Sequence, residues 1–119
     1  MKLLPTPKKS DLFFLPLGGT GEIGMNFNLY GHKGKWLIVD CGVTFRDENI
    51  PGAEIIMPDI VSLKGHEENI SGILLTHAHE DHFGAVHYLW PYLKCPVYAT
   101  PFTAYLLKNR LSEFHLDQE

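Results

Sequence analysis

Four side chains of types that bind metal ions lie within six residues of the sequence. The segment 77–82 reads His-Ala-His-Glu-Asp-His and directly follows an apolar run. In an extended stretch, side chains two residues apart point to the same side, so His77 and His79 can bind one metal ion. Asp81 and His82 come where the chain turns into a helix, and we expect them to face a second ion beside the first. The segment therefore predicts a two-metal site.

Imidazole nitrogen and carboxylate oxygen suit Zn²⁺, and the same donors accept Mn²⁺ or Fe²⁺. Two such ions about 3.5–4 Å apart can share a hydroxide and hold both the attacking and the leaving oxygen of a phosphoryl displacement. No side chain is an obvious nucleophile, and no Ser-His-Asp arrangement is visible. A histidine cluster on the surface, without a function, is the alternative interpretation of this segment.

Polar residues around this segment receive other roles. Asp40 ends an apolar run, and we expect it to orient the ligand segment, the alternative being an ordinary acid at a strand end. Glu80 suits the first turn of a helix, where negative charge is stabilised, better than metal binding. His87 is expected to be a packed or exposed residue of a helix. Cys41 is expected to be a small buried hydrophobic residue and not a soft ligand.

The elements that must position the segment follow an α/β order. Pro16 places the first strand at a sheet edge or strand end, the second and third strands form a hairpin, and the third is central. Apolar or alternating runs predict strands at 12–17, 26–30, 36–40, 70–76 and 97–99. Helical spacing and N-cap residues predict helices at 59–64, 82–93 and 101–114. The segment 41–58 is predicted to be a loop.

A glycine-rich segment raises a rival function. Residues 19–24 fit the G-x-G-x-x-G pattern of dinucleotide-binding folds, and Asp40 lies near the position expected of a ribose-binding acid. That fold needs a helix directly after the glycines, because the pyrophosphate sits on its N-terminus. Residues 25–35 alternate and then break at glycines, so this helix is missing. We expect a tight turn with close backbone approach, or a loop whose amides line the rim of an active site.

Composition excludes several classes. With 45% hydrophobic and 20% charged residues, the 119-residue chain is close to a globular average, which excludes disorder and collagen-like repeats. No apolar window approaches the roughly 18 residues of a membrane span, and residues 1–10 are expected to be a flexible leader and not a signal peptide. Two cysteines are too few for a disulfide scaffold, which favours a reduced, cytoplasmic setting. A net charge of −4 gives no overall basic surface for nucleic acid.

These residues resemble a known family. The H-x-H-x-D-H segment is similar to the signature of the metallo-β-lactamase superfamily, which includes lactamases, glyoxalases and nucleases. Its flanks resemble the start of the ribonuclease J family, in the β-CASP branch of that superfamily. The flanking matches are 17–26 (LGGTGEIGMN), 38–42, 58–60, 75–85 and 96–101. The resemblance covers about 12–111, and the glycine-loop match is what favours ribonuclease J.

The resemblance implies a fold, a site and an activity. The fold would be α/β (α+β by some schemes): the N-terminal half of an αββα sandwich, a mixed sheet with a hairpin and flanking helices, at 11–119. His77 and His79 would bind the first zinc, and Asp81 and His82 the second, with Mn possible. Asp40 would match the strand-end aspartate of β-CASP enzymes. The implied reaction is hydrolysis of RNA phosphodiesters, both endonucleolytic and 5′-to-3′ exonucleolytic, in the cytoplasm.

The family also needs ligands that cannot be assigned after His82: a further histidine, a bridging aspartate and a late histidine. Its β-CASP and C-terminal domains are likewise not found in the sequence. We therefore expect an isolated chain that is inactive and binds metal weakly, and whose exposed inner sheet face joins copies into a homo-oligomer without a membrane partner. A non-catalytic metal-binding half-domain, or a small-substrate hydrolase of the same superfamily, is the alternative.

Overall fold

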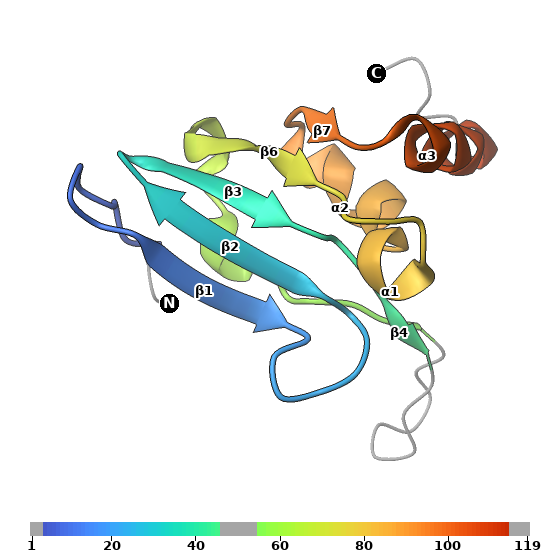
Figure 1. Cartoon of the computed structure of the whole chain (residues 1–119), viewed down its shortest axis with the longest axis horizontal. Helices are drawn as coiled ribbons and strands as arrows, with labels where there is room; N and C mark the ends of the chain where they lie inside the picture. The colour runs from blue at the N-terminus through green and yellow to red at the C-terminus, as the bar shows by residue number, and fades with distance from the viewer. Residues whose placement is uncertain (1–3, 46–54, 115–119) are drawn as a thin grey trace.

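The structure is a computed structural model that describes residues 4–45 and 55–114. Its main element is a five-stranded mixed sheet in the order β1-β2-β3-β6-β7 (Figure 1). The strands are β1 Phe13–Gly18, β2 Phe27–His32, β3 Lys35–Val39, β6 Ile70–Leu74 and β7 Val97–Tyr98. β1, β2 and β3 pair antiparallel, whereas β6 is parallel to both β3 and β7. This is the α/β class and the mixed sheet with a hairpin that the sequence predicts.

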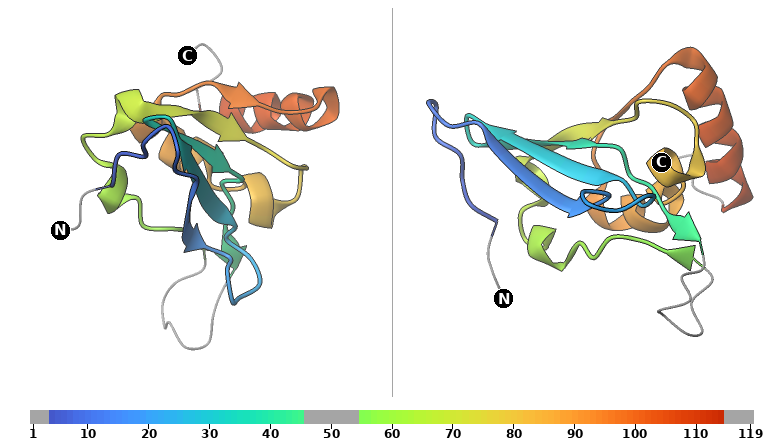
Figure 2. Two further views of the ribbon diagram at one scale, coloured as in Figure 1. Left: turned by 60° about the vertical axis from the view of Figure 1, so that its left-hand side comes forward. Right: turned by 60° about the horizontal axis from the view of Figure 1, so that its bottom comes forward.

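Within residues 4–45 and 55–114, three α-helices and two single 3₁₀ turns accompany the sheet. They are η1 Val61–Leu63, η2 Glu67–Asn69, α1 Glu80–Phe83, α2 Val86–Leu93 and α3 Pro101–Glu113. In Figure 1, α2 lies behind the sheet, and Figures 1 and 2 place α3 beyond the carboxyl ends of the parallel strands β3, β6 and β7, next to α1. No helix in the described part of the chain combines the length and apolarity needed to cross a bilayer.

The hairpin between β2 and β3 follows from its turn residues. His32 pairs with Lys35, so the loop has two residues, Lys33 and Gly34. Both have positive φ, 48° and 78°. A two-residue loop with positive φ at both positions matches the right-handed twist of the strands, and a glycine accepts that conformation without strain.

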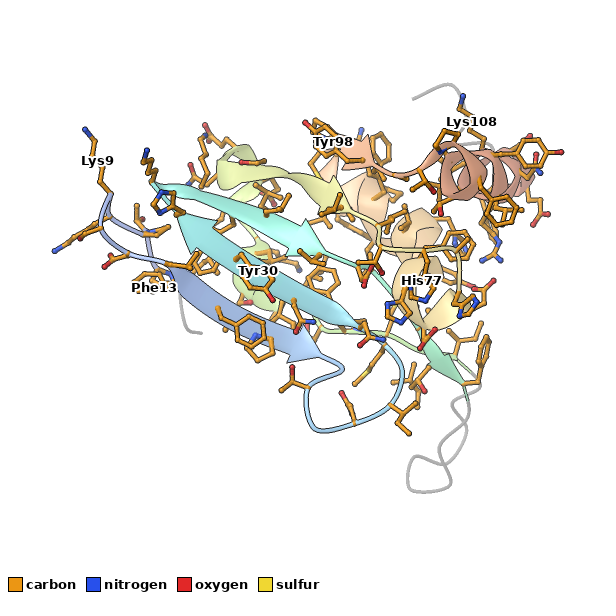
Figure 3. The ribbon with its side chains drawn as sticks, viewed as in Figure 1. Lys9, Phe13, Tyr30, His77, Tyr98 and Lys108 are labelled. Atoms are coloured by element: carbon orange, nitrogen blue, oxygen red, sulfur yellow. The ribbon has the colours of Figure 1, made fainter. Side chains whose placement is uncertain are left out.

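The two faces of the sheet differ in burial. One face points toward α2 and carries the core, whose strand residues are Phe27, Leu29, Trp36, Ile38 and Ile73. The other face exposes apolar side chains, of which the largest are Phe14, Tyr30, Leu74 and Tyr98. The rings of Phe14 and Tyr30 are paired on it, with centroids 5.2 Å apart. Tyr30 is labelled in Figure 3, on the face turned toward the viewer. We call this side the open sheet face.

The prediction of one helix at 82–93 is wrong. The helical segment begins two residues earlier and is split at Gly84 and Ala85 into α1 and α2. In a continuous helix Ala85 N–H would bond to Asp81 O. That carbonyl instead accepts from a neighbouring loop, and Ala85 N–H donates to Cys41 O at 2.9 Å. Tertiary hydrogen bonds therefore replace helical ones at this point.

Other segments depart from prediction in smaller ways. Residues 41–58, predicted to be a loop, contain the strands β4 Thr44–Phe45 and β5 Ile55–Ile56, which pair antiparallel, while 46–54 lie outside the described residues. The helix predicted at 59–64 is the single turn η1, to which Asp59 contributes a hydrogen bond from Val61 N–H to its carboxylate (2.9 Å). Within the segment predicted to be a leader, Leu4 is buried in the core, and Pro5 O accepts from Trp36 Nε1 at 3.1 Å.

Candidate metal centre

The parallel pairing of β3 and β6 brings their carboxyl ends to one edge of the sheet. Asp40 follows β3, and Thr76 and His77 follow β6. Asp40 N–H continues the ladder by donating to Leu74 O at 2.8 Å. Residues far apart in sequence thus meet at the start of the segment 77–82, as Figure 3 shows for His77 beyond the end of β6.

Asp40 is the centre of a hydrogen-bond network. It is 5% exposed, and its backbone has φ 67°, a left-handed conformation that aspartate adopts more readily than most residues. Its carboxylate accepts from Thr76 N–H (2.8 Å) and Thr76 Oγ1 (2.9 and 3.0 Å). His82 Nδ1 lies 2.7 Å from the second carboxylate oxygen. Asp40 therefore holds both the end of β6 and the ring of His82, and its role in orienting metal ligands stays a prediction.

The tautomers of two histidines follow from this network. A carboxylate only accepts, so His82 Nδ1 carries the proton that it shares with Asp40. Thr76 has one hydroxyl proton, which it donates to Asp40, so its contact with His77 Nδ1 at 2.9 Å must be donated by the histidine. Nδ1 is thus protonated in both His77 and His82. Their Nε2 lone pairs are left for a metal ion, which is the arrangement that metal-binding histidines usually have.

The four predicted ligands lie close together. The ring centroids of His77 and His82 are 4.0 Å apart, and those of His77 and His79 are 4.6 Å apart. Asp81 Oδ2 lies 3.4 Å from His82 Nε2, so these two groups face the same space. Within the described residues, however, no three or more His, Cys, Asp or Glu side chains form a group that could hold a metal ion. The donor types and tautomers fit a divalent metal with ligands still missing, and the ligand assignment stays a prediction.

The backbone of α1 is held to two loops of the sheet edge. Its carbonyls accept from three loop amides: Glu80 O from Val43 N (3.0 Å), Asp81 O from Asn26 N (2.9 Å) and His82 O from Cys41 N (2.8 Å). Gly42 is required beside them, because a Cβ there would lie 1.8 Å from Asp81 O. These contacts place the side chains of Asp81 and His82 at the sheet edge.

Two residues of this site were not singled out by sequence reasoning. Asn26 Nδ2 donates to Asp81 O at 3.0 Å and lies 3.4 Å from His82 Nε2. Thr76 connects Asp40 with His77. Thr76 stands between the apolar strand and the first histidine, where a hydroxyl was a usable signal. Asn26 carries no such signal, since its role depends on contacts across 55 residues.

The glycine-rich segment forms a turn that leads into a strand. β2 begins at Phe27, so no helix follows the glycines, as predicted. Gly19, Gly21 and Gly24 have positive φ. A Cβ on Gly19 would lie 2.5 Å from Asn26 Oδ1. Close backbone approach is therefore the reason for glycine here.

Three other residues lie as the sequence predicts. Cys41 is fully buried, and burial raises the pKa of its thiol, so it stays neutral and unsuited to metal. His87 is buried in α2. Glu80 is the first residue of α1, and its carboxylate is paired with Arg110 of α3, a partner that sequence reasoning did not identify.

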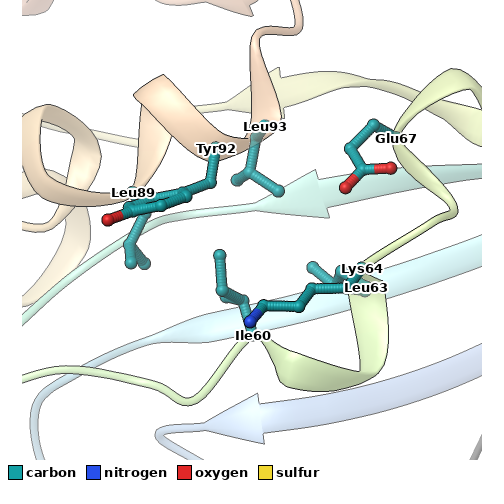
Figure 4. Close-up of a pocket in the computed structure, with 7 residues that line it drawn as sticks. All are labelled: Ile60, Leu63, Lys64, Glu67, Leu89, Tyr92 and Leu93. Atoms are coloured by element: carbon teal, nitrogen blue, oxygen red, sulfur yellow. The ribbon is translucent and has the colours of Figure 1, made fainter.

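A groove of about 490 Å³ lies elsewhere, between α2 and the segment that contains η1 and η2 (Figure 4). Its wall is mostly apolar, with Lys64 and Glu67 as the charged residues. None of its lining residues belongs to 77–82. This groove is separate from the candidate metal centre.

Comparison with known proteins agrees with this geometry. Residues 21–118 match the metallo-beta-lactamase superfamily, and the chain belongs to that superfamily. Curated relatives named Ribonuclease J match most of the chain: 53% identity over 104 residues with the protein from Sinorhizobium meliloti, 38% over 108 with that from Helicobacter pylori and 40% over 104 with that from Mycolicibacterium smegmatis. These matches cover 84%, 91% and 84% of the chain.

The chain spans only 16–18% of the length of these relatives, within their N-terminal part. The resemblance to ribonuclease J predicted from the motifs is thereby confirmed. The activity of the whole relatives remains a matter of proposal for this chain.

Proposed function

We propose that this chain is the N-terminal portion of a metal-dependent ribonuclease of the ribonuclease J type. The observation that carries the proposal is the hydrogen-bond chain from His77 through Thr76 and Asp40 to His82. It leaves Nε2 of two histidines of a metal motif as an acceptor nitrogen, which a purely structural histidine cluster does not require. The relatives named Ribonuclease J give the substrate class.

In this proposal His77 and His79 bind one ion, and Asp81 and His82 bind a second. Zn²⁺, or Mn²⁺, would supply the charge that polarises a phosphodiester and activates water. Asp40 and Thr76 hold the rings in the tautomer that binds metal, and Asn26 fixes the turn from the opposite side. The reaction would be endonucleolytic and 5′-to-3′ exonucleolytic hydrolysis of RNA in the cytoplasm.

The second candidate is a metal-binding half-domain without catalysis. It is favoured by the absence, among the described residues, of a group of three or more ligands that could hold a metal ion. With two ligands for each ion, metal affinity should be weak and the isolated chain inactive. We further propose that the open sheet face joins copies of the chain into a homo-oligomer, because contiguous exposed apolar surface favours association.

The two candidates are separated by a chimera. The matching segment of the Sinorhizobium meliloti relative is replaced by this chain, and hydrolysis of end-labelled RNA is followed with and without a chelator. We expect chelator-sensitive hydrolysis that is lost when Asp81 is changed to Asn. A folded, metal-containing chimera without hydrolysis would favour the half-domain. Turnover of a thioester or β-lactam with RNA left intact would favour a small-substrate hydrolase.

A further inference from the structure

We infer that Arg110 is a positioning residue that orients the metal-binding turn through Glu80. The inference deepens the proposed function and rests on it. Glu80 lies inside the motif segment but was not predicted to bind metal. Arg110 lies near the end of α3, 30 residues further along the chain. The contact between them joins α1 and α3, neither of which belongs to the sheet.

Arg110 contacts both ends of α1. Its Nη1 donates to Glu80 Oε2 at 3.2 Å, and its Nη2 to Glu80 Oε1, so the pair is bidentate. The guanidinium carbon also lies 5.5 Å from the ring centroid of Phe83. Asp81 and His82, two of the predicted ligands, stand between the two residues that Arg110 touches.

The turn is therefore held from two sides. The loops at Asn26 and 41–43 bind its carbonyls, which ties its backbone to the sheet edge. The contact of Glu80 with Arg110 adds a hold on the turn from α3, through a side chain that the loops do not bind. Figures 1 and 2 show α3 beside α1. The orientation of the turn matters because it sets where Asp81 and His82 point.

Gly84 makes room for this arrangement. The carboxylate of Glu80 folds back over it, and a Cβ on Gly84 would lie 2.4 Å from Glu80 Oε2. The φ of Gly84 is −66°, so its backbone does not demand glycine. Space for the Glu80 side chain is thus a reason for glycine after the motif.

The ion pair is better explained by position than by stability. The two side chains are 26% and 36% exposed, and partly exposed pairs contribute little to the free energy of unfolding. A bidentate pair does, however, fix the relative orientation of its partners, which a point charge such as lysine does less well. The hydrogen bond from Arg110 to Glu80 raises the pKa of the guanidinium, so it stays charged.

The experiment compares Arg110→Met with Lys108→Met in the complete chain. Lys108 is exposed on the same helix and points away from α1 (Figure 3), so its removal is a matched loss of charge. Affinity for Co²⁺ is measured by visible absorption, and amide hydrogen exchange of α1 is measured without metal. We expect Arg110→Met to weaken Co²⁺ binding about tenfold, the lower end for residues that support ligands, with Lys108→Met unchanged. Exchange at His82, Phe83 and Gly84 should rise about tenfold in Arg110→Met alone.

Rescue separates positioning from folding. Arg110→Lys should recover part of the Co²⁺ affinity. The double variant Glu80→Gln/Arg110→Met should bind Co²⁺ no more weakly than Arg110→Met alone, because both substitutions remove the same contact between Glu80 and Arg110. Equal Co²⁺ affinity or equal α1 exchange in the Arg110→Met and Lys108→Met chains would overturn the inference. If the unmodified chain binds no Co²⁺ at all, the proposed metal site fails instead, and the exchange data still decide whether Arg110 holds the turn.

Discussion

Replacing Asp40 with asparagine tests the hydrogen-bond network directly. The two side chains have the same shape, and asparagine also tolerates the positive φ at this position, so the backbone need not move. The change replaces one carboxylate oxygen by an NH₂ group. In the unmodified chain three donor groups converge on the two carboxylate oxygens, namely Thr76 N–H, Thr76 O–H and His82 Nδ1–H.

The amide can satisfy these groups in only one way. Its oxygen must accept from Thr76, because NH₂ facing the Thr76 N–H would place two donors together. The NH₂ group then faces His82 Nδ1, which must give up its proton and accept. The proton moves to Nε2, the nitrogen that the metal needs. The variant is therefore expected to fold with the wrong tautomer of His82.

The magnitudes follow from that exchange. Hydrogen bonds to a carboxylate are worth about 1.5–3 kcal/mol and neutral ones about 1 kcal/mol, so the bond of His82 alone accounts for a loss of about 0.5–2 kcal/mol of stability. For a domain of this size the midpoint of thermal unfolding should fall by roughly 2–10 °C. Metal affinity should fall by about 10–100-fold, the usual effect of losing a residue that orients a ligand.

Three measurements check the prediction: thermal unfolding, Co²⁺ titration, and the nitrogen chemical shifts of His82, which report its tautomer. Asp59→Asn is the control. That carboxylate also accepts a backbone N–H, from Val61 of η1, and η1 is not part of the metal segment 77–82. If Asp40→Asn binds Co²⁺ as tightly as the unmodified chain while His82 carries its proton on Nε2, the argument from tautomers is refuted.

Three further predictions concern packing, pH and assembly. Gly42→Ala places a Cβ 1.8 Å from Asp81 O and should lower the free energy of unfolding, measured with urea, by about 2–3 kcal/mol. Burial, and then the charge of Arg110, lower the pKa of His87 from 6.5, and its Nδ1 has no hydrogen-bond partner among the described residues. The unfolded chain therefore binds more protons, so stability should fall as the pH drops through about 6.5, and less steeply in His87→Leu. Tyr30→Lys, on the open sheet face, should shift the chain from oligomer toward monomer in sedimentation.

Each of these has a control or an outcome that would contradict it. Gly34→Ala has open space around its Cβ and a positive φ, so it should cost only about 1 kcal/mol, the strain of that conformation. Equal losses for both glycines would contradict the steric argument. An unchanged slope of stability against pH in His87→Leu would contradict the assignment of this loss to His87. Tyr105→Lys, at an exposed position on α3, should not alter sedimentation, and a monomeric unmodified chain at all concentrations would contradict the assembly prediction.

Periodicity and turn chemistry were sufficient for the elements whose causes are local. The hairpin of β2 and β3 depends on Lys33 and Gly34, and α3 begins where Thr100 accepts a hydrogen bond from Thr103 N–H. The split between α1 and α2 could not be predicted in this way. It arises because loop amides, including that of Asn26, occupy the carbonyls that a continuous helix would need.

The residues of the candidate site also fall into those that the local sequence identifies and those that depend on tertiary contacts. The segment 77–82 is contiguous, so residue type and spacing identify it. Asp40 was expected near this segment from its place at a strand end, but its contact with Thr76 across 36 residues depends on the parallel pairing of β3 and β6. The pairing of Glu80 with Arg110 depends in addition on how α3 packs against α1, which the sequence of α3 does not determine.

Contiguity of the ligands has a thermodynamic consequence. Since the four candidate ligands lie within six residues, an unfolded chain still holds all of them in one short peptide and can also bind a metal ion. A ligand stabilises a fold only by the ratio of its affinities for the folded and unfolded chains. If the fold raises affinity about 100-fold by fixing tautomers, saturating metal can add no more than about 2.7 kcal/mol to stability. Once both the folded and the unfolded chain are saturated, additional metal should not change the midpoint of thermal unfolding.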